Sequence, residues 1–236
     1  MPTRRHRKHF DDDIVRAEAV LSHAGGGLAS QTLADDICRA SVVLAVASLD
    51  AYFCDAYVDV LTCAFRAHRA GTLVKLPKQY AKESLPAGPL VANHYTTRPD
   101  WSLRMAARGL MERDNLLQVG RLKEMFNPVL PAQKKLWGDL APTFIALGRK
   151  RLTGVLPADI AGINGEKLTR KLTSAGNAVL KRIGEIIQRR HDVAHNFDRP
   201  KQARQPLTHA AAIKMIADVK AFVVTFDDHL EANRTV

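Results

Sequence analysis

Hydrophobic residues recur along most of this chain at the three- and four-residue spacing that places them on one face of an α-helix. That spacing predicts helices at residues 11–23, 30–70, 100–114, 131–152, 174–190 and 208–231. No segment indicates a β-strand, and Ala, Leu, Lys and Arg, which favour helix, are abundant. The sequence therefore predicts an all-α fold.

The segment at residues 30–70 is the longest predicted helix, and its character changes along its length. Residues 42–49 are apolar on nearly every face, which is typical of a central, buried helix. The whole apolar run, residues 40–49, meets Asp50 after about ten residues, which is too short for a membrane span. Farther along, polar residues at four- and three-residue spacing form one stripe: Asp55, Asp59, Thr62 and Arg66.

The remaining segments are organised around this long helix. Residues 1–10 carry a basic run without apolar periodicity, and we expect them to form a flexible basic arm. Proline and glycine interrupt residues 72–99, which predicts a connector. We expect residues 11–236 to form a single helical domain, with residues 72–165 as a long helical insert between the long helix and the helix at 174–190.

Within the helix predicted at 131–152, a break is expected near Pro142. Four residues of this segment keep the spacing of a core-facing stripe, which we favour over a base-stacking role: Trp137, Leu140, Phe144 and Leu147.

Charge is distributed unevenly along the chain. The formal net charge is +11, yet residues 10–70 hold four Lys and Arg against nine Asp and Glu, while residues 149–204 hold thirteen against five. The basic region suits a polyanion, because counterion release would supply affinity; the alternative is a solvated surface that aids solubility. The three cysteines have no metal-like spacing and are typical of a reduced intracellular protein. We therefore expect a cytoplasmic protein with no metal and no cofactor.

The strongest candidate for chemistry lies where the helix at 174–190 meets a polar segment. Arg190 and His195 stand there at Arg-x4-His spacing. Two other pairs share that spacing but do not follow a patterned helix: Arg4 with His9, and Arg204 with His209. Helical periodicity places Arg190 on the apolar face with Ile183 and turns Arg189 toward solvent.

These two residue types can cleave RNA without a metal. RNA carries its own nucleophile, the 2′-hydroxyl, which a neutral His195 would deprotonate while Arg190 holds the phosphate oxygens. On an ideal helix, residues five apart are about 140° apart around the axis. The two side chains therefore converge only if the helix ends within the motif, at His191 or Asp192, or if two copies meet across a two-fold axis.

Residues 190–195 resemble the Arg-x4–6-His signature of the HEPN superfamily, which comes late in an all-helical bundle, before a last helix. Residues 41–53 resemble the long apolar helix of RiboL-PSP-like HEPN proteins, in which an acidic residue is followed by an aromatic. Asp50 and Tyr52 occupy those two positions. The chain departs from the pattern at His191, where Asn is commoner, and at Phe197, where some relatives have a modifiable Tyr.

The resemblance implies a HEPN-like helical bundle, a homodimer and a metal-independent endoribonuclease that leaves a 2′,3′-cyclic phosphate. Arg190 and His195 match the catalytic pair of the family. We expect four residues to support them: His191, Asp192, Asn196 and Asp50. We expect three arginines to contact RNA: Arg182, Arg189 and Arg199. Such proteins often act in toxin–antitoxin, phage-defence or stress systems, so an antitoxin or other regulatory protein is a candidate partner.

Two other functions stay open at this stage. The chain would be a non-catalytic RNA-binding or scaffold HEPN protein if it binds RNA without cutting it. A helical DNA-binding regulator would need a tight helix–turn–helix with a basic recognition helix, and the sequence contains no clean one. No membrane partner is expected.

Overall fold

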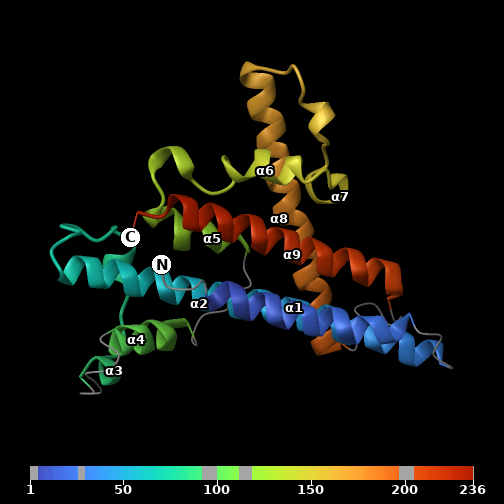
Figure 1. The fold of residues 1–236 in the computed structure, drawn as a ribbon, viewed down its shortest axis with the longest axis horizontal. Coiled ribbons are helices and arrows are strands. Elements are labelled where there is room, and N and C mark those ends of the chain that lie inside the picture. Colours follow the sequence, from blue (N-terminus) through green and yellow to red (C-terminus); the bar gives the residue numbers. More distant parts are fainter. Residues whose placement is uncertain (1–4, 26–29, 92–99, 112–118, 197–204, 236) are drawn as a thin grey trace. The chain divides into compact units, whose positions relative to one another are not determined.

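The computed structural model describes residues 5–25, 30–91, 100–111, 119–196 and 205–235 (Figure 1). Its α-helices are α1 (Arg5–Ala24), α2 (Gln31–Arg69), α3 (Ala87–Val91), α4 (Trp101–Met111), α5 (Leu122–Phe126), α6 (Leu140–Ala146), α7 (Lys150–Thr153), α8 (Gly165–Asn196) and α9 (His209–Asn233). Short 3-10 turns join some of them, and these ranges contain no β-strand. The all-α prediction is confirmed.

The chain divides into two compact units. Unit 1 comprises residues 1–52 and 137–229, and unit 2 comprises residues 53–136 and 230–236. Helices α2 and α9 each contribute to both units. The insert predicted at 72–165 is divided between them, because residues 137–165 belong to unit 1 with α8. The expectation of a single domain at residues 11–236 stays a prediction.

The buried side chains of unit 1 come mainly from four long helices. In the apolar stretch of α2, Val42, Val46 and Leu49 are at most 1% exposed, which confirms the predicted burial, although Leu44 is 39% exposed. The other helices bury Ile14 and Leu21 of α1, Val179, Ile183 and Ile186 of α8, and Val219, Phe222 and Phe226 of α9. Their spacing along each helix explains why these segments fold as helices and why these faces are buried.

A buried carboxylate holds the start of α1 in unit 1. Asp227 of α9 is 0% exposed and accepts hydrogen bonds from the hydroxyl of Tyr52 at 2.9 Å and from His6 Nε2 at 3.1 Å. Arg7 Nη1 donates to the other oxygen of Asp227 at 3.4 Å. The prediction of a flexible basic arm at residues 1–10 is therefore wrong for residues 5–10, which are part of α1. His6 and Arg7 are part of this helix although the segment lacks apolar periodicity, because the distant carboxylate of Asp227 pairs with them.

The helix predicted at 131–152 is instead two short helices, α6 and α7. The break lies at Gly148, whose φ of +66° falls in the left-handed region that glycine adopts readily. Pro142, where the break was expected, lies in the first turn of α6, where the missing N–H costs no helical hydrogen bond.

The aromatic residues of this region belong to the core. The rings of Trp137 and Phe144 stack on Phe222, with centroids 6.0 and 5.9 Å away. Leu140 is also buried, so the core prediction is confirmed for these three residues. It is wrong for Leu147, which is 42% exposed at the end of α6.

In unit 2 the polar stripe of α2 pairs with α4. Ion pairs link this stripe to α4 and to the residue directly before it: Arg108 with Asp55, Arg104 with Asp59, and Arg66 with Asp100. The partners run in opposite order along the two helices, so α4 lies antiparallel to this part of α2. Within the stripe, Thr62 is buried and its hydroxyl donates to the carbonyl of Val58 instead.

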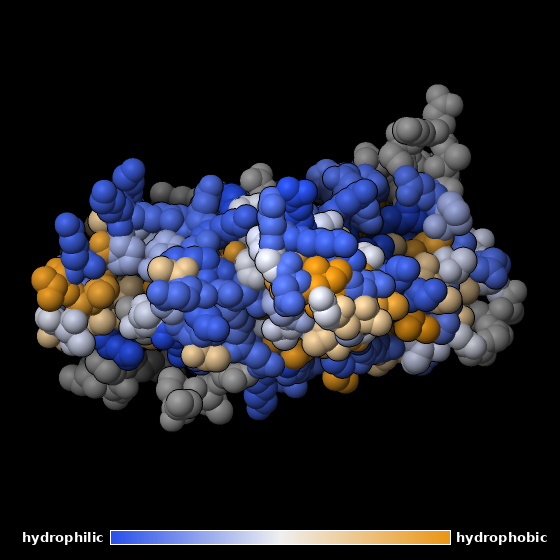
Figure 2. Space-filling view, turned by 90° about the horizontal axis from the view of Figure 1, so that it is seen from above, coloured by the Kyte–Doolittle hydropathy of each residue, from blue (hydrophilic) through white to orange (hydrophobic). Residues whose placement is uncertain are grey.

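Contrary to the expectation from its short apolar run, helix α2 is long and apolar enough to cross a membrane by length and composition alone. Of its most apolar window, 56% is buried within the protein, and a buried core helix passes the same test. Figure 2 shows one face of the molecule covered mainly by hydrophilic residues, with hydrophobic residues in separate groups. The expectation that the chain has no membrane partner stays a prediction.

Candidate functional site

The Arg190–His195 motif lies inside α8, near its C-terminal end. This helix runs from Gly165 to Asn196 and is longer than the helix predicted at 174–190. The helix does not end at His191 or Asp192. The prediction that a helix end within the motif brings Arg190 and His195 together is therefore wrong. Arg190 and His195 project about 140° apart around one regular helix. Within a single chain they face different directions.

Arg190 is half-buried, and its Nε atom is buried without a hydrogen-bond partner among the described residues. A buried guanidinium N–H without an acceptor is costly, because it has lost its hydrogen bond to water. The position is therefore suited to a ligand that brings an acceptor, and phosphate oxygens match a guanidinium well.

Asp50 of α2 interacts electrostatically with Arg190. Burial raises the pKa of the Asp50 carboxyl above its usual value of 3.8, and the positive charge of Arg190 acts in the opposite direction. The structure thus brings together two predicted site residues that lie far apart in the sequence. Since the effect of burial is larger, the carboxylate is held where its charge is unfavourable, a pattern common at functional sites.

His191 and His195 lie one turn apart on an exposed face of α8. Their ring centroids are 4.4 Å apart and the rings are inclined by 48°. Asp192 is half-buried and accepts a hydrogen bond from Gln188 Nε2 at 2.8 Å, within the same helix. Asn196 is the last residue of α8, and its side chain lies outside the described part of the protein, as does Arg199.

Arg189 is oriented differently from the prediction. Its side chain is buried, and its Nη2 atom donates to the main-chain oxygen of Gln205 at 3.0 Å. Nη1 donates to the side-chain oxygen of the same glutamine. The expectation that Arg189 points to solvent is wrong, and its assignment to RNA binding stays a prediction. Helical periodicity cannot reveal that the segment before α9 covers this side of α8.

Arg39 is a further buried residue in this region that sequence reasoning missed. It is 4% exposed, and its Nη2 atom donates to the same Gln205 oxygen at 2.9 Å. Two guanidinium groups, from α2 and α8, thus bind one carbonyl. The only signal in the sequence was an arginine within a largely apolar helix.

Arg182, the third arginine expected to contact RNA, is paired with a buried acid. Its Nε atom donates to Asp218 Oδ2 at 3.0 Å, while Arg151 Nε donates to the other oxygen at 2.9 Å. Asp218 is 0% exposed, so this pairing neutralises a buried carboxylate. Its role in RNA binding stays a prediction.

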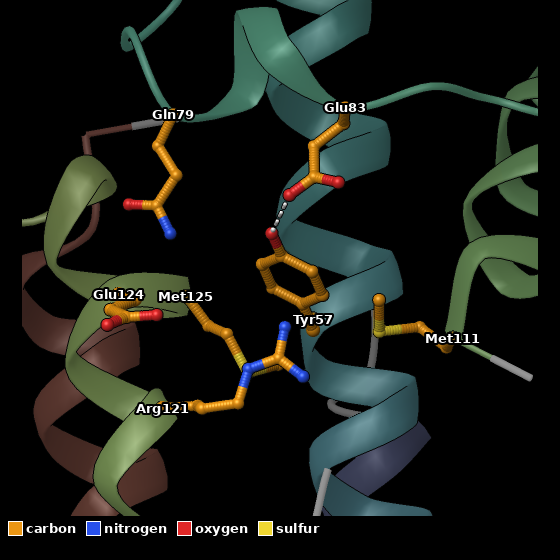
Figure 3. A pocket seen from close by; sticks show the side chains of 7 residues that line it. All are labelled: Tyr57, Gln79, Glu83, Met111, Arg121, Glu124 and Met125. Carbon is orange, nitrogen blue, oxygen red and sulfur yellow. Dashed lines mark hydrogen bonds between the residues drawn. The ribbon is translucent and has the colours of Figure 1, made fainter. Parts of the chain in front are cut away.

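A small pocket lies in unit 2 and contains none of the predicted site residues (Figure 3). It is lined by Tyr57, Gln79, Glu83, Met111, Arg121, Glu124 and Met125. The hydroxyl of Tyr57 donates to Glu83 at its edge, at 3.4 Å. Both acidic and basic groups line it, so its charge does not select one class of ligand.

The motif residues offer the groups that phosphodiester cleavage requires. Arg190 supplies a cation with an unsatisfied donor, and His195 supplies an exposed imidazole. Among the described residues, no group of three or more His, Cys, Asp or Glu side chains is arranged to hold a metal ion. Within one chain, the continuous helix α8 separates the two groups around its axis.

The model of the RiboL-PSP-HEPN family matches residues 9–232, which includes α2, α8 and the whole Arg190–His195 motif. No curated protein and no solved structure matches the chain.

Proposed function

The chain belongs to the RiboL-PSP-HEPN family, a family of helical HEPN-type domains, and we propose on this basis that it is a metal-independent endoribonuclease. Its substrate is RNA, and its product carries a 2′,3′-cyclic phosphate. The observation that carries the proposal is Arg190: a half-buried guanidinium beside Asp50, with a buried Nε that lacks a described partner, five residues before an exposed histidine.

In the proposed reaction, neutral His195 takes the proton of the 2′-hydroxyl. The resulting oxyanion attacks the adjacent phosphorus, and the bond from phosphorus to the 5′-oxygen breaks. The departing 5′-oxygen receives a proton from a protonated histidine or from water. Arg190 stabilises the charge that builds on the non-bridging oxygens, which is the largest contribution expected from a single residue.

Asp50 is a positioning residue in this proposal. Its carboxylate lies close enough to Arg190 for charge interaction, yet it leaves Nε unpaired. It can therefore orient the guanidinium of Arg190 through charge interaction alone. His191 contacts the ring of His195 and restricts its orientation. Asp192 and Asn196, at the same end of α8, help to orient the catalytic pair.

A homodimer completes the proposed site. Because Arg190 and His195 diverge on a regular helix, Arg190 of one chain and His195 of the other would act on the same phosphate. A two-fold axis near the end of α8 would form two such sites. Uncontrolled RNA cleavage harms a cell, so we propose a cytoplasmic toxin or defence effector held in check by a regulatory protein.

One observation favours a second candidate, a non-catalytic RNA-binding or scaffold protein. Arg190 and His195 do not converge within one chain, so a monomer would bind phosphate through Arg190 but lack the proton transfer. Binding without cutting would identify this alternative. Competition between structured RNA and duplex DNA would test for a DNA-binding regulator at the same time.

The experiment that tests the proposal is cleavage of RNA in EDTA, with the product ends identified. Wild-type protein is compared with His195→Ala and with His23→Ala, a matched loss of an exposed histidine on α1. Cleavage to a 2′,3′-cyclic phosphate that is lost only in His195→Ala supports the proposal. RNA binding without cleavage in all three proteins, at concentrations where the protein is dimeric, rejects it.

A further inference from the structure

Two exposed imidazoles one helical turn apart form the most distinctive side-chain pair on α8. His191 and His195 are both exposed, and their ring centroids lie 4.4 Å apart. Histidines at this four-residue spacing lie on one face of a helix, and this is the spacing with which helices present two nitrogen ligands to zinc.

The two rings lie close enough together to share one metal ion. Zinc binds an imidazole nitrogen at about 2.0–2.1 Å, so two imidazoles that share one ion at the tetrahedral angle have centroids about 5.2 Å apart. The observed 4.4 Å is shorter than that separation, and rotation of two exposed side chains would lengthen it. The neighbouring Asp192 accepts a hydrogen bond from Gln188 in the preceding turn.

We propose that His191 and His195 together bind a divalent transition-metal ion of the kind that prefers imidazole, with Zn²⁺ as the representative ion. No group of three or more suitable side chains occurs among the described residues, so this is a two-ligand site whose other positions are taken by water. It is distinct from a structural zinc site, which needs four protein ligands.

The effect of the ion depends on the proposed nuclease function. A metal bound to His195 occupies the nitrogen lone pair that accepts the proton of the 2′-hydroxyl. The ion is therefore an inhibitor rather than a cofactor, and it acts by blocking proton transfer. Cleavage in EDTA and inhibition by Zn²⁺ are two consequences of the same exposed imidazole.

Binding is tested without reference to activity. Chelator-treated protein is titrated with ZnCl₂ in a calorimeter, using wild type, His191→Ala, His195→Ala and the control His23→Ala, with circular dichroism to verify that all four are folded. We expect the tightest zinc-binding event to weaken at least tenfold in both motif variants and to persist in His23→Ala. Equal zinc affinity in all four proteins, or no binding to the wild type, overturns the site.

Inhibition is measured separately. Each protein's cleavage rate in ZnCl₂ is divided by its own rate in EDTA, so that a change in basal activity does not affect the comparison. Wild type should be inhibited and His191→Ala should be much less sensitive. If zinc binds through both histidines but the wild type is not inhibited, the inhibitory role is rejected while the binding site stands. If no cleavage occurs under any condition, the nuclease proposal fails while the calorimetric result still decides the metal site.

Discussion

The charge of Arg190 acts on Asp50 across two helices, and it does not fully offset the effect of burial on that carboxyl. Asp50 is therefore an ion whose charged form is disfavoured in the folded protein. A group of this kind reduces stability when it is ionised, and its presence indicates a role other than stability. The first prediction follows from that relationship.

Asp50→Asn should reduce cleavage without reducing stability. The substitution removes a carboxylate whose folded-state pKa is raised, so the native protein no longer carries a disfavoured charge at pH 7. We expect the free energy of unfolding at pH 7 to equal or exceed that of the wild type. Cleavage should fall by about 10- to 100-fold, because the guanidinium of Arg190 loses its orientation.

The raised pKa of Asp50 also predicts how its contribution to stability changes with pH. A raised carboxyl pKa means that the folded state binds more protons than the unfolded state just above pH 3.8, so the contribution of Asp50 to stability declines as the pH rises through that window. Chemical denaturation across this range should show the wild type losing stability relative to Asp50→Asn as the pH rises. A variant that is less stable at neutral pH would contradict the prediction.

Arg189→Ala and Arg190→Ala should have opposite effects although the residues are adjacent. Loss of Arg189 removes the hydrogen bonds that hold Gln205, and we expect a cost of about 1–3 kcal/mol in unfolding free energy. Loss of Arg190 removes no hydrogen bond from its buried Nε and takes away only a partial compensation of the Asp50 charge, so the loss of stability should be smaller than in Arg189→Ala, while cleavage should fall by about 10²–10³-fold. Urea denaturation and cleavage assays on both variants provide the measurement. Equal losses of stability would argue against the different roles.

Asp227→Asn should destabilise the protein and flatten its acid response. Burial raises the pKa of the Asp227 carboxyl, but hydrogen bonds from His6 and Tyr52 and the charges of His6 and Arg7 together lower it below 3.8. Breaking such a buried pair costs about 3–5 kcal/mol. The stability that this lowered pKa provides is present above pH 3.8 and is lost as the pH falls through the lower folded value.

Thermal unfolding of the wild type should therefore show a decrease of stability below pH 3.8, and Asp227→Asn should show a smaller decrease from a lower starting value. Because helix α1 depends on this carboxylate, proteolysis of the variant should begin within residues 5–10. A wild-type acid response that the substitution does not alter would count against the network.

Mixing two inactive variants should restore activity if each site uses both chains. Arg190→Ala and His195→Ala are each expected to be inactive as homodimers. In their heterodimer one of the two sites keeps both an intact arginine and an intact histidine. Random exchange makes about half of the dimers mixed, so about one quarter of the wild-type activity should return. If tagged heterodimers can be isolated and remain inactive, the shared site is excluded.

Helical periodicity was a sound guide where burial alone decides structure. It predicted the long helix at 30–70, observed as Gln31–Arg69, and the burial of Val42, Val46 and Leu49. It also predicted the polar stripe that pairs with α4, because ionic groups on one face of a helix need either solvent or a partner. The spacing of apolar and polar residues can be read directly from the sequence, and the helix, its buried face and its polar stripe follow from that spacing.

The predictions that were wrong failed because they depend on contacts between residues far apart in the sequence. The basic residues before Phe10 join α1 because Asp227 pairs with them, and Arg189 is buried because Gln205 covers it. Neither partner is near in sequence, and no spacing rule identifies it. In the candidate site, the sequence analysis named Arg190, His195 and Asp50 as site residues. The structure places Asp50 close enough to Arg190 for charge interaction. The continuation of α8 through the motif was not foreseen, because polar residues at a helix end are compatible with either outcome.

The bonds of Arg39 and Arg189 to Gln205 also bear on which sequence changes the family can accumulate. Both arginines donate to the main-chain oxygen of residue 205, which every amino acid possesses. Natural variants should therefore tolerate other residues at position 205 better than the loss of arginine at positions 39 and 189, because a substitution at 205 removes only the side-chain bond to Arg189. The attachment of the segment before α9 is specified more by the residues that hold it than by the residue that is held.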